Sequence, residues 1–168
     1  MTMQDDKGFT LIELLIVVAI IGIIAAIAVP GLLRARMSGN EASAIGSLRS
    51  INSAEASYAA GNGGYAILLG TLALPCPGGT VGFISVDLSL DPTTKSGFTV
   101  ALTSATGSAG PNDCNGTATE TDYYAEAEPT AFGTTGNRSF STNQAGTIFA
   151  IPAAAIAPAD MIPLNSIH

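Results

Sequence analysis

The sequence predicts an α+β fold, in which one long N-terminal α-helix packs on a C-terminal antiparallel β-sheet. Three observations lead to this prediction. No charged residue lies between Glu13 and Arg34, apolar residues then recur at three- and four-residue steps as far as Ala60, and the rest of the chain alternates short β-branched runs with Gly and Pro. The 168 residues suffice for one domain and an anchoring segment.

Composition and charge exclude several classes of function. The net charge of −7 argues against nucleic-acid binding through a basic face and against attraction to anionic lipid headgroups. The sequence has no serine nucleophile elbow, no phosphate-binding glycine loop and no metal-ligating His pair, and its single His is His168. We therefore expect no enzymatic activity, no cofactor and no metal site.

The apolar segment is long enough to cross a membrane. Residues 14–33 would span about 30 Å as a helix, the thickness of a bilayer's hydrocarbon core, so a transmembrane helix is the first interpretation. The alternative is a secretory signal peptide with Ala26-Ile27-Ala28 as its cleavage site. The acidic Asp5 and Asp6, the length of the apolar run and Glu13 inside it argue against this alternative.

Glu13 is a carboxylate at the entrance of the apolar segment, where it needs a partner. Thr10-Leu11-Ile12-Glu13 fits a capping box, in which Glu13 accepts a free N–H at the start of the helix. Alternatively, Glu13 meets a positive group on another chain when apolar helices pack together. A cut after Gly8 would create such a group, the amine of Phe9.

The residues Lys7-Gly8-Phe9-Thr10-Leu11-Ile12-Glu13-Leu14-Leu15 resemble the leader and processing site of type IV prepilins and of the related pseudopilins. The resemblance extends to about residue 60 and implies the pilin fold. It also implies that prepilin peptidase cleaves between Gly8 and Phe9, that Phe9 is N-methylated, and that Glu13 pairs with a neighbouring subunit's amine during assembly. The acidic leader departs from the family, whose leaders are usually basic.

Gly22 and Pro30 are expected to shape the apolar helix. Ala19, Gly22 and Ala26 recur at helical spacing, and small residues let helix backbones approach closely, although apolar helices also contain Ala and Gly without such a role. Pro30 lacks an N–H and crowds the preceding turn, so we expect it to kink or loosen the helix. In filaments of the family the segment corresponding to Gly22–Pro30 loosens, and the resemblance implies the same here.

The helix continues beyond the apolar segment as an amphipathic half. We expect Glu41, Arg49 and Glu55 to lie away from its apolar stripe, and Gly61-Asn62-Gly63-Gly64 to end it. The stripe consists of Met37, Ala44, Ile45, Leu48, Ile51 and Tyr58. The expected segments are a leader at 1–8, a transmembrane and assembly helix at 9–33, its amphipathic continuation at 34–60 and a β-rich head at 61–168.

The head is expected to contain five strands. Phe98, Val100 and Leu102 alternate with small or polar residues, which is typical of a half-buried antiparallel strand, and 143–146 has the composition of a hairpin turn. The C-terminal residues 152–168 are expected to form a loosely packed tail. The expected strands are Val81–Leu90, Phe98–Thr103, Tyr123–Glu128, Arg138–Thr142 and Thr147–Ile151.

Two groups of head residues could carry chemistry. Cys76 and Cys114 would lie outside the cytoplasm, where a disulfide is favoured, and two buried free thiols are the alternative. The acidic stretch from Asn112 to Asp122 could hold calcium, but its spacing departs from the EF-hand rule, and we expect a solvated loop. The carboxylate pairs Asp87 with Asp91 and Glu126 with Glu128 are expected to lie on solvated faces.

The resemblance implies a structural subunit, a type IV pilin that polymerises into a pilus. Its expected partners are copies of itself in a helical filament, prepilin peptidase, the assembly machinery and the inner membrane, in which the subunit waits before it joins an extracellular pilus. A type II secretion pseudopilin in a periplasmic pseudopilus is an alternative that shares every N-terminal feature. Two further alternatives are a membrane-tethered binding module and a soluble protein exported after cleavage at Ala28.

Overall fold

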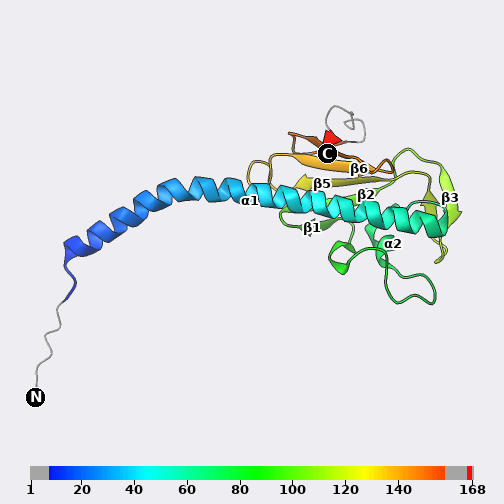
Figure 1. Ribbon diagram of the computed structural model, residues 1–168, viewed down its shortest axis with the longest axis horizontal. Helices are drawn as coiled ribbons and strands as arrows, with labels where there is room; N and C mark the ends of the chain where they lie inside the picture. The colour runs from blue at the N-terminus through cyan, green and yellow to red at the C-terminus, as the bar shows by residue number, and fades with distance from the viewer. Residues whose placement is uncertain (1–7, 158–165, 168) are drawn as a thin grey trace, which may run out of the picture. The chain divides into compact units, whose positions relative to one another are not determined.

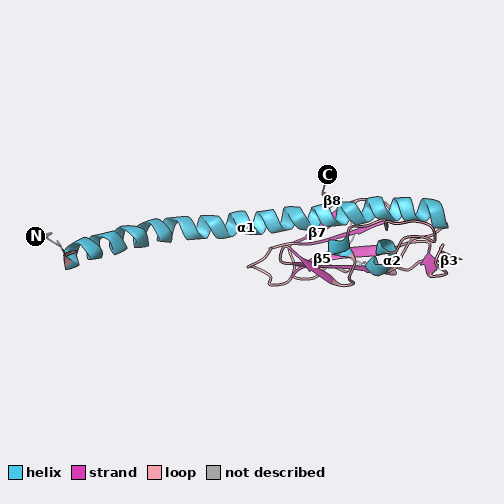
Figure 2. Cartoon of the chain, turned by 90° about the horizontal axis from the view of Figure 1, so that it is seen from below, coloured by secondary structure: helices cyan, strands magenta, loops and turns pink. Residues whose placement is uncertain are grey.

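The computed structural model describes residues 8–157 and 166–167, and its architecture is one long helix with antiparallel β-structure (Figure 1). Helix α1 spans Leu11–Asn62, and the chain forms two compact units whose boundary lies between Arg36 and Met37. In the second unit, the later half of α1 lies along one face of a sheet (Figure 2). The predicted α+β class is confirmed.

The sequence explains both ends of α1. Thr10 caps its first turn, and Gly63 ends it with a φ of 76°, a left-handed conformation that glycine adopts without strain. The N–H of Gly63 donates to the carbonyl of Ala59 at 2.8 Å, as expected at a helix C-terminus. The helix continues through Pro30. Loosening between Gly22 and Pro30 therefore stays a prediction about the assembled state.

The main sheet has six strands in the order β1-β2-β5-β6-β7-β8, all paired antiparallel. Four of the five predicted strands are confirmed as β2, β5, β6 and β7, and the predicted hairpin turn joins the last two. The strands are β1 Thr93–Lys95, β2 Phe98–Thr103, β5 Tyr124–Pro129, β6 Ser139–Asn143, β7 Ile148–Ile151 and β8 Ser166–Ile167, and a separate hairpin pairs β3 Ala109–Asn112 with β4 Ala118–Glu120.

The core lies between the later half of α1 and the sheet. The alternation predicted for β2 is confirmed, because Phe98, Val100 and Leu102 are all buried. Small residues on the central strand β5 let the helix approach the sheet closely. The helix contributes Ala44, Leu48, Ile51, Ala54 and Tyr58, and the sheet contributes Phe98, Val100, Leu102, Ala125, Ala127, Phe140 and Ile148.

The strand predicted at Val81–Leu90 is wrong. This segment wraps around the short helix α2, Leu69–Ala73, and contains a 3-10 turn, η1, at Val86–Leu88. Its backbone hydrogen bonds are local or go to that helix, since the N–H groups of Phe83 and Ile84 both donate to the carbonyl of Leu72. β-branched composition alone does not make a strand when no neighbouring strand is available.

The expectation that Glu41 and Glu55 lie away from the apolar stripe is also wrong, because both are buried in the interface between α1 and the head. Glu41 accepts the backbone N–H of Asn137 at 2.8 Å and two bonds from the Arg138 guanidinium, at 2.7 and 3.0 Å. The apolar stripe is narrower than the sheet that it covers, so polar positions are buried beside it and take partners.

The C-terminal segment is fastened as far as the structure describes it, which corrects the loose tail expected at 152–168. Ile156 is buried, its N–H donates to Glu128 at 3.0 Å, and its carbonyl accepts the hydroxyl of Tyr124 at 2.7 Å. Strand β8 pairs with β7 at the sheet edge. The rest of the expected tail, residues 158–165 and 168, lies outside the described residues.

Cys76 and Cys114 form a disulfide that joins the loop after α2 to the β3–β4 turn, with a Cα–Cα distance of 5.5 Å. The N–H of Cys114 also donates to the side chain of Asn62 at 3.1 Å. The bridge therefore ties two loops to the end of α1.

Replacing both Cys76 and Cys114 with Ser should lower the free energy of unfolding by roughly 2–4 kcal/mol. The two cysteines are 38 residues apart, and without the bridge the loop between them gains conformational freedom in the unfolded chain. Urea unfolding of the full chain in detergent, followed by the near-UV circular dichroism of its tyrosines, measures the change. Dithiothreitol should lower the unfolding free energy of the parent by the same amount as the two substitutions do. It should leave the unfolding free energy of the double variant unchanged. A parent protein indifferent to reduction would contradict the assignment.

Arg138→Ala should cost about 1–3 kcal/mol, because it leaves the mostly buried Glu41 carboxylate without its cation. The matched control is Lys95→Ala, which removes the more exposed ion pair with Asp87 and should cost less than about 1 kcal/mol. The same urea titration compares the two variants. Equal losses of unfolding free energy would contradict the larger contribution that we assign to the ion pair of Glu41.

Candidate functional site

The candidate processing site precedes the helix. Residues 8–10 lie outside α1 and are exposed, and the Phe9 side chain is 90% exposed. A peptidase needs an extended and accessible substrate, and helical backbone would have to unwind first. The peptide bond between Gly8 and Phe9 is non-helical and exposed, so it is accessible in this way.

Glu13 adopts the capping-box arrangement in the single chain. Its Oε2 accepts the backbone N–H of Thr10 at 2.8 Å and the Thr10 hydroxyl at 2.6 Å, while the Glu13 N–H donates to that hydroxyl oxygen at 3.3 Å. No hydrogen bond reaches Oε1 from the described part of the chain. One carboxylate oxygen thus fixes the start of the helix, and the other is available to a further donor.

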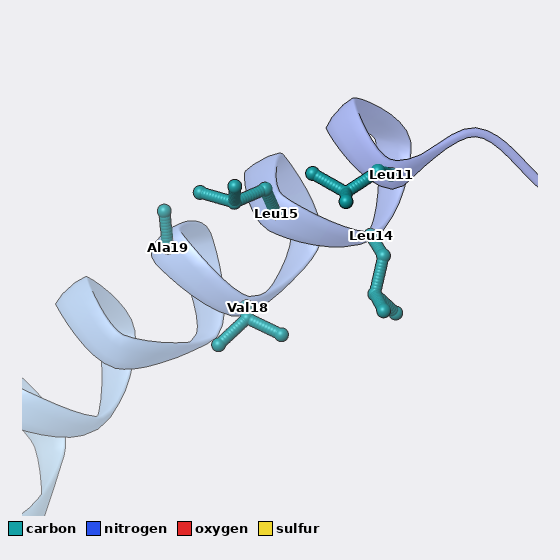
Figure 3. A pocket seen from close by; sticks show the side chains of 5 residues that line it. All are labelled: Leu11, Leu14, Leu15, Val18 and Ala19. Atoms are coloured by element: carbon teal, nitrogen blue, oxygen red, sulfur yellow. The ribbon is translucent and has the colours of Figure 1, made fainter.

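The first unit of α1 exposes apolar side chains in every direction. Each large apolar residue from Leu11 to Leu33 is at least half exposed. Near the N-terminus an open apolar hollow of about 400 Å³ lies on this surface, with Leu11, Leu15 and Ala19 along one edge (Figure 3). Leu14 and Val18 line the other edge. Such a surface is unstable in water, so lipid or other protein must cover it.

Within the described residues, α1 is the one helix that is long and apolar enough to cross a membrane, as judged by its length and composition. A Cβ built on Gly22 would meet no atom of this chain within 4 Å. The fold of the single chain therefore does not require glycine at this position. Any requirement must come from a neighbouring helix or from helix flexibility.

One carboxylate of the acidic stretch, Asp113, has a structural role. Asp113 is buried, its Oδ2 accepts the Tyr58 hydroxyl at 2.8 Å, and its Oδ1 accepts the backbone N–H groups of Asn115 and Thr117 at 2.9 and 2.6 Å. The loop expected to be solvated is thus anchored to α1. No group of three or more His, Cys, Asp or Glu residues that could hold a metal ion occurs in residues 8–157 and 166–167.

Carboxylates of the two predicted pairs also bind backbone groups. Asp91 accepts the N–H of Leu69 at 2.9 Å and of Leu102 at 3.2 Å, so it connects α2 to β2. Glu128 accepts the N–H of Ile156, which positions the C-terminal segment. These contacts assign both side chains to holding loops in place.

Comparison with known proteins places the similarity at the N-terminus. The family described as "Prokaryotic N-terminal methylation motif" matches residues 3–29. The type IV wide pilus major component PilA4 of Thermus thermophilus is 62% identical over 39 residues, 23% of this chain and 30% of the relative. The type IV major pilin protein PilA of Myxococcus xanthus is 45% identical over 53 residues, 32% of this chain and 24% of the relative.

A fimbrial protein of Pseudomonas aeruginosa is 79% identical over 28 residues, 17% of this chain and 18% of the relative. The chain thus spans less than a third of the length of the curated relatives it matches, and no solved structure matches it. The matched residues include Gly8, Phe9 and Glu13, and the arrangement of one long helix on an antiparallel sheet is pilin-like. The chain therefore carries the prokaryotic N-terminal methylation motif and resembles the type IV pilins at its N-terminus.

Proposed function

We propose that this chain is a type IV pilin, a structural subunit that prepilin peptidase cleaves after Gly8 and methylates on Phe9. The mature subunit waits in the inner membrane with the apolar half of α1 in lipid. It then polymerises into an extracellular helical filament with the help of an assembly machinery. Its role is structural and not catalytic.

The exposed apolar surface of the first unit is the observation that carries this proposal. Its side chains point in all directions, so a membrane or a bundle of identical helices can cover them equally well. Transfer from lipid into such a bundle is nearly neutral in hydrophobic free energy. Polar contacts and close packing at small residues such as Gly22 can then determine how the subunits align.

Glu13 is the polar group that aligns the subunits. Its Oε2 remains on Thr10 at the start of the helix, and its Oε1 accepts the N-methylated amine of Phe9 from a neighbouring subunit. A charge-assisted hydrogen bond in an apolar bundle is stronger than the same bond in water. This pair therefore favours one register between neighbouring helices.

The similar proteins favour a pilus over a pseudopilus, because they are pilus and fimbrial components. A membrane-tethered binding module would use the same helix only as an anchor. It would have no need for an acid with a free oxygen at the start of that anchor.

Glu13→Gln should reduce surface filaments about ten-fold or more, because it keeps an oxygen for the Thr10 cap and removes the charge that binds the amine. Immunoblots of sheared filaments and of membranes measure assembly and subunit level separately. The control Glu120→Gln, a half-buried carboxyl of the head, should assemble normally. Normal filament yield from the Glu13 variant would support the tether.

The mass of the mature N-terminus tests the processing step. We expect a chain that begins with N-methylated Phe9, because the peptide bond before it is exposed and non-helical. Mass spectrometry of the purified native protein distinguishes this end from a chain that begins at Met1 and from one cut after Ala28. Either of those ends would contradict the proposal.

A further inference from the structure

Glu55 is a carboxyl group buried between the later half of α1 and the head. It lies on the later half of α1, its exposed fraction is 0%, and its Oε2 accepts the backbone N–H of Ala66 at 3.0 Å. Its Oε1 has no hydrogen-bond partner in the described part of the chain. A buried oxygen without a partner is costly, and the cost is far larger when the group carries a charge.

Among residues 8–157 and 166–167, the groups that interact with Glu55 offer no compensating positive charge. Tyr58, on the same helix, and Tyr123, at the entrance of β5, interact electrostatically with it. The next groups outward are Tyr65, whose ring packs on Tyr123, and Asp113, which accepts the Tyr58 hydroxyl. All four can carry only negative charge. The ion pairs of Arg138 and Lys95 are made with Glu41 and Asp87.

We propose that Glu55 is a protonation switch that sets how tightly the end of α1 and the turn after it are held on the sheet. With the proton bound, the carboxyl fits the closed interface and fixes the turn through Ala66. Without it, a negative charge is buried where the described residues place no cation beside it. The charge can reach water only if the interface around Glu55 and Ala66 opens.

Burial is the main cause that raises the pKa of Glu55 to about 8, and the hydrogen bond from Ala66 opposes it weakly. In the unfolded chain the pKa returns to about 4.5, the ordinary value for this group. The stability that Glu55 contributes is therefore complete below about pH 4.5 and is lost as pH rises toward 8, because the unfolded chain releases its proton first. Burial also raises the pKa of Tyr58 and of Tyr123, so both stay neutral over this range.

If the interface around Glu55 opened, the two loops that the disulfide joins would also lose their contacts with α1. Tyr58, one helical turn later, hydrogen-bonds Asp113, and Asn62 at the end of α1 accepts the N–H of Cys114. The β3–β4 turn therefore depends on the last turns of the helix. Alkaline pH should loosen this end of the head while the Glu41 contacts at the other end of the interface persist. The inference concerns the contact between α1 and the head and does not rest on polymerisation.

Thermal unfolding of the full chain in detergent tests the switch. The near-UV circular dichroism of the four tyrosines, all between Tyr58 and Tyr124, reports on the second unit, which begins at Met37. Between pH 5 and pH 9 the melting temperature of the parent should fall by about 5–10 °C. Glu55→Gln should remove most of this fall, because its amide oxygen still accepts the Ala66 N–H and it cannot ionise. The control Glu120→Gln should behave like the parent.

The proposal would be overturned if the melting temperature of Glu55→Gln fell as much between pH 5 and pH 9 as that of the parent. A second measurement needs no variant and serves if Glu55→Gln does not fold. With glutamate labelled at its side-chain carboxyl carbon, the Glu55 resonance should titrate well above the exposed glutamates in the folded chain. A midpoint in the ordinary range near 4.5 would contradict the switch.

Discussion

The architecture depends on one constraint, the apolar surface around the first half of α1, which the described part of the chain leaves exposed. From Leu11 to Leu33 the large side chains are at least half exposed, and the described part of the chain has no charge between Glu13 and Arg34. Hydrophobic surface of this extent must be covered by lipid or by other helices. The similarity to pilins and the capped, exposed start of α1 agree with this requirement.

The second half of the same helix meets the opposite requirement, because it must be held on one sheet in one register. Its apolar contacts form a narrow stripe, and polar side chains fix its position along the sheet. Glu41 binds Asn137 and Arg138 at one end, and Tyr58 binds Asp113 at the other. Between them Asn52 accepts the hydroxyl of Tyr123 and donates to the carbonyl of Gly146. Directional bonds of this kind specify a register that a narrow apolar stripe leaves open.

The sequence predicted the features that follow from local periodicity. These are the long helix and its glycine end, four strands of the sheet and the capping box at Glu13. It did not predict the burial of Glu41 and Glu55 or the bond from Tyr58 to Asp113, because the partners in these contacts are 11 to 97 residues apart in sequence. The prediction of a strand at 81–90 failed for a related reason. The segment has the composition of a strand, but no neighbouring strand pairs with it in the described part of the chain. The Gly8, Phe9 and Glu13 roles rest on the motif and stay predictions.

The most direct test of the central claim is a helical reconstruction by electron microscopy of filaments purified from the native source. We expect a bundle of α1 helices on the filament axis, starting at Phe9, with the apolar residues up to Leu33 shielded from solvent and the sheets outside. A native protein that remains a membrane monomer, or a filament in which this segment faces solvent, would contradict the account.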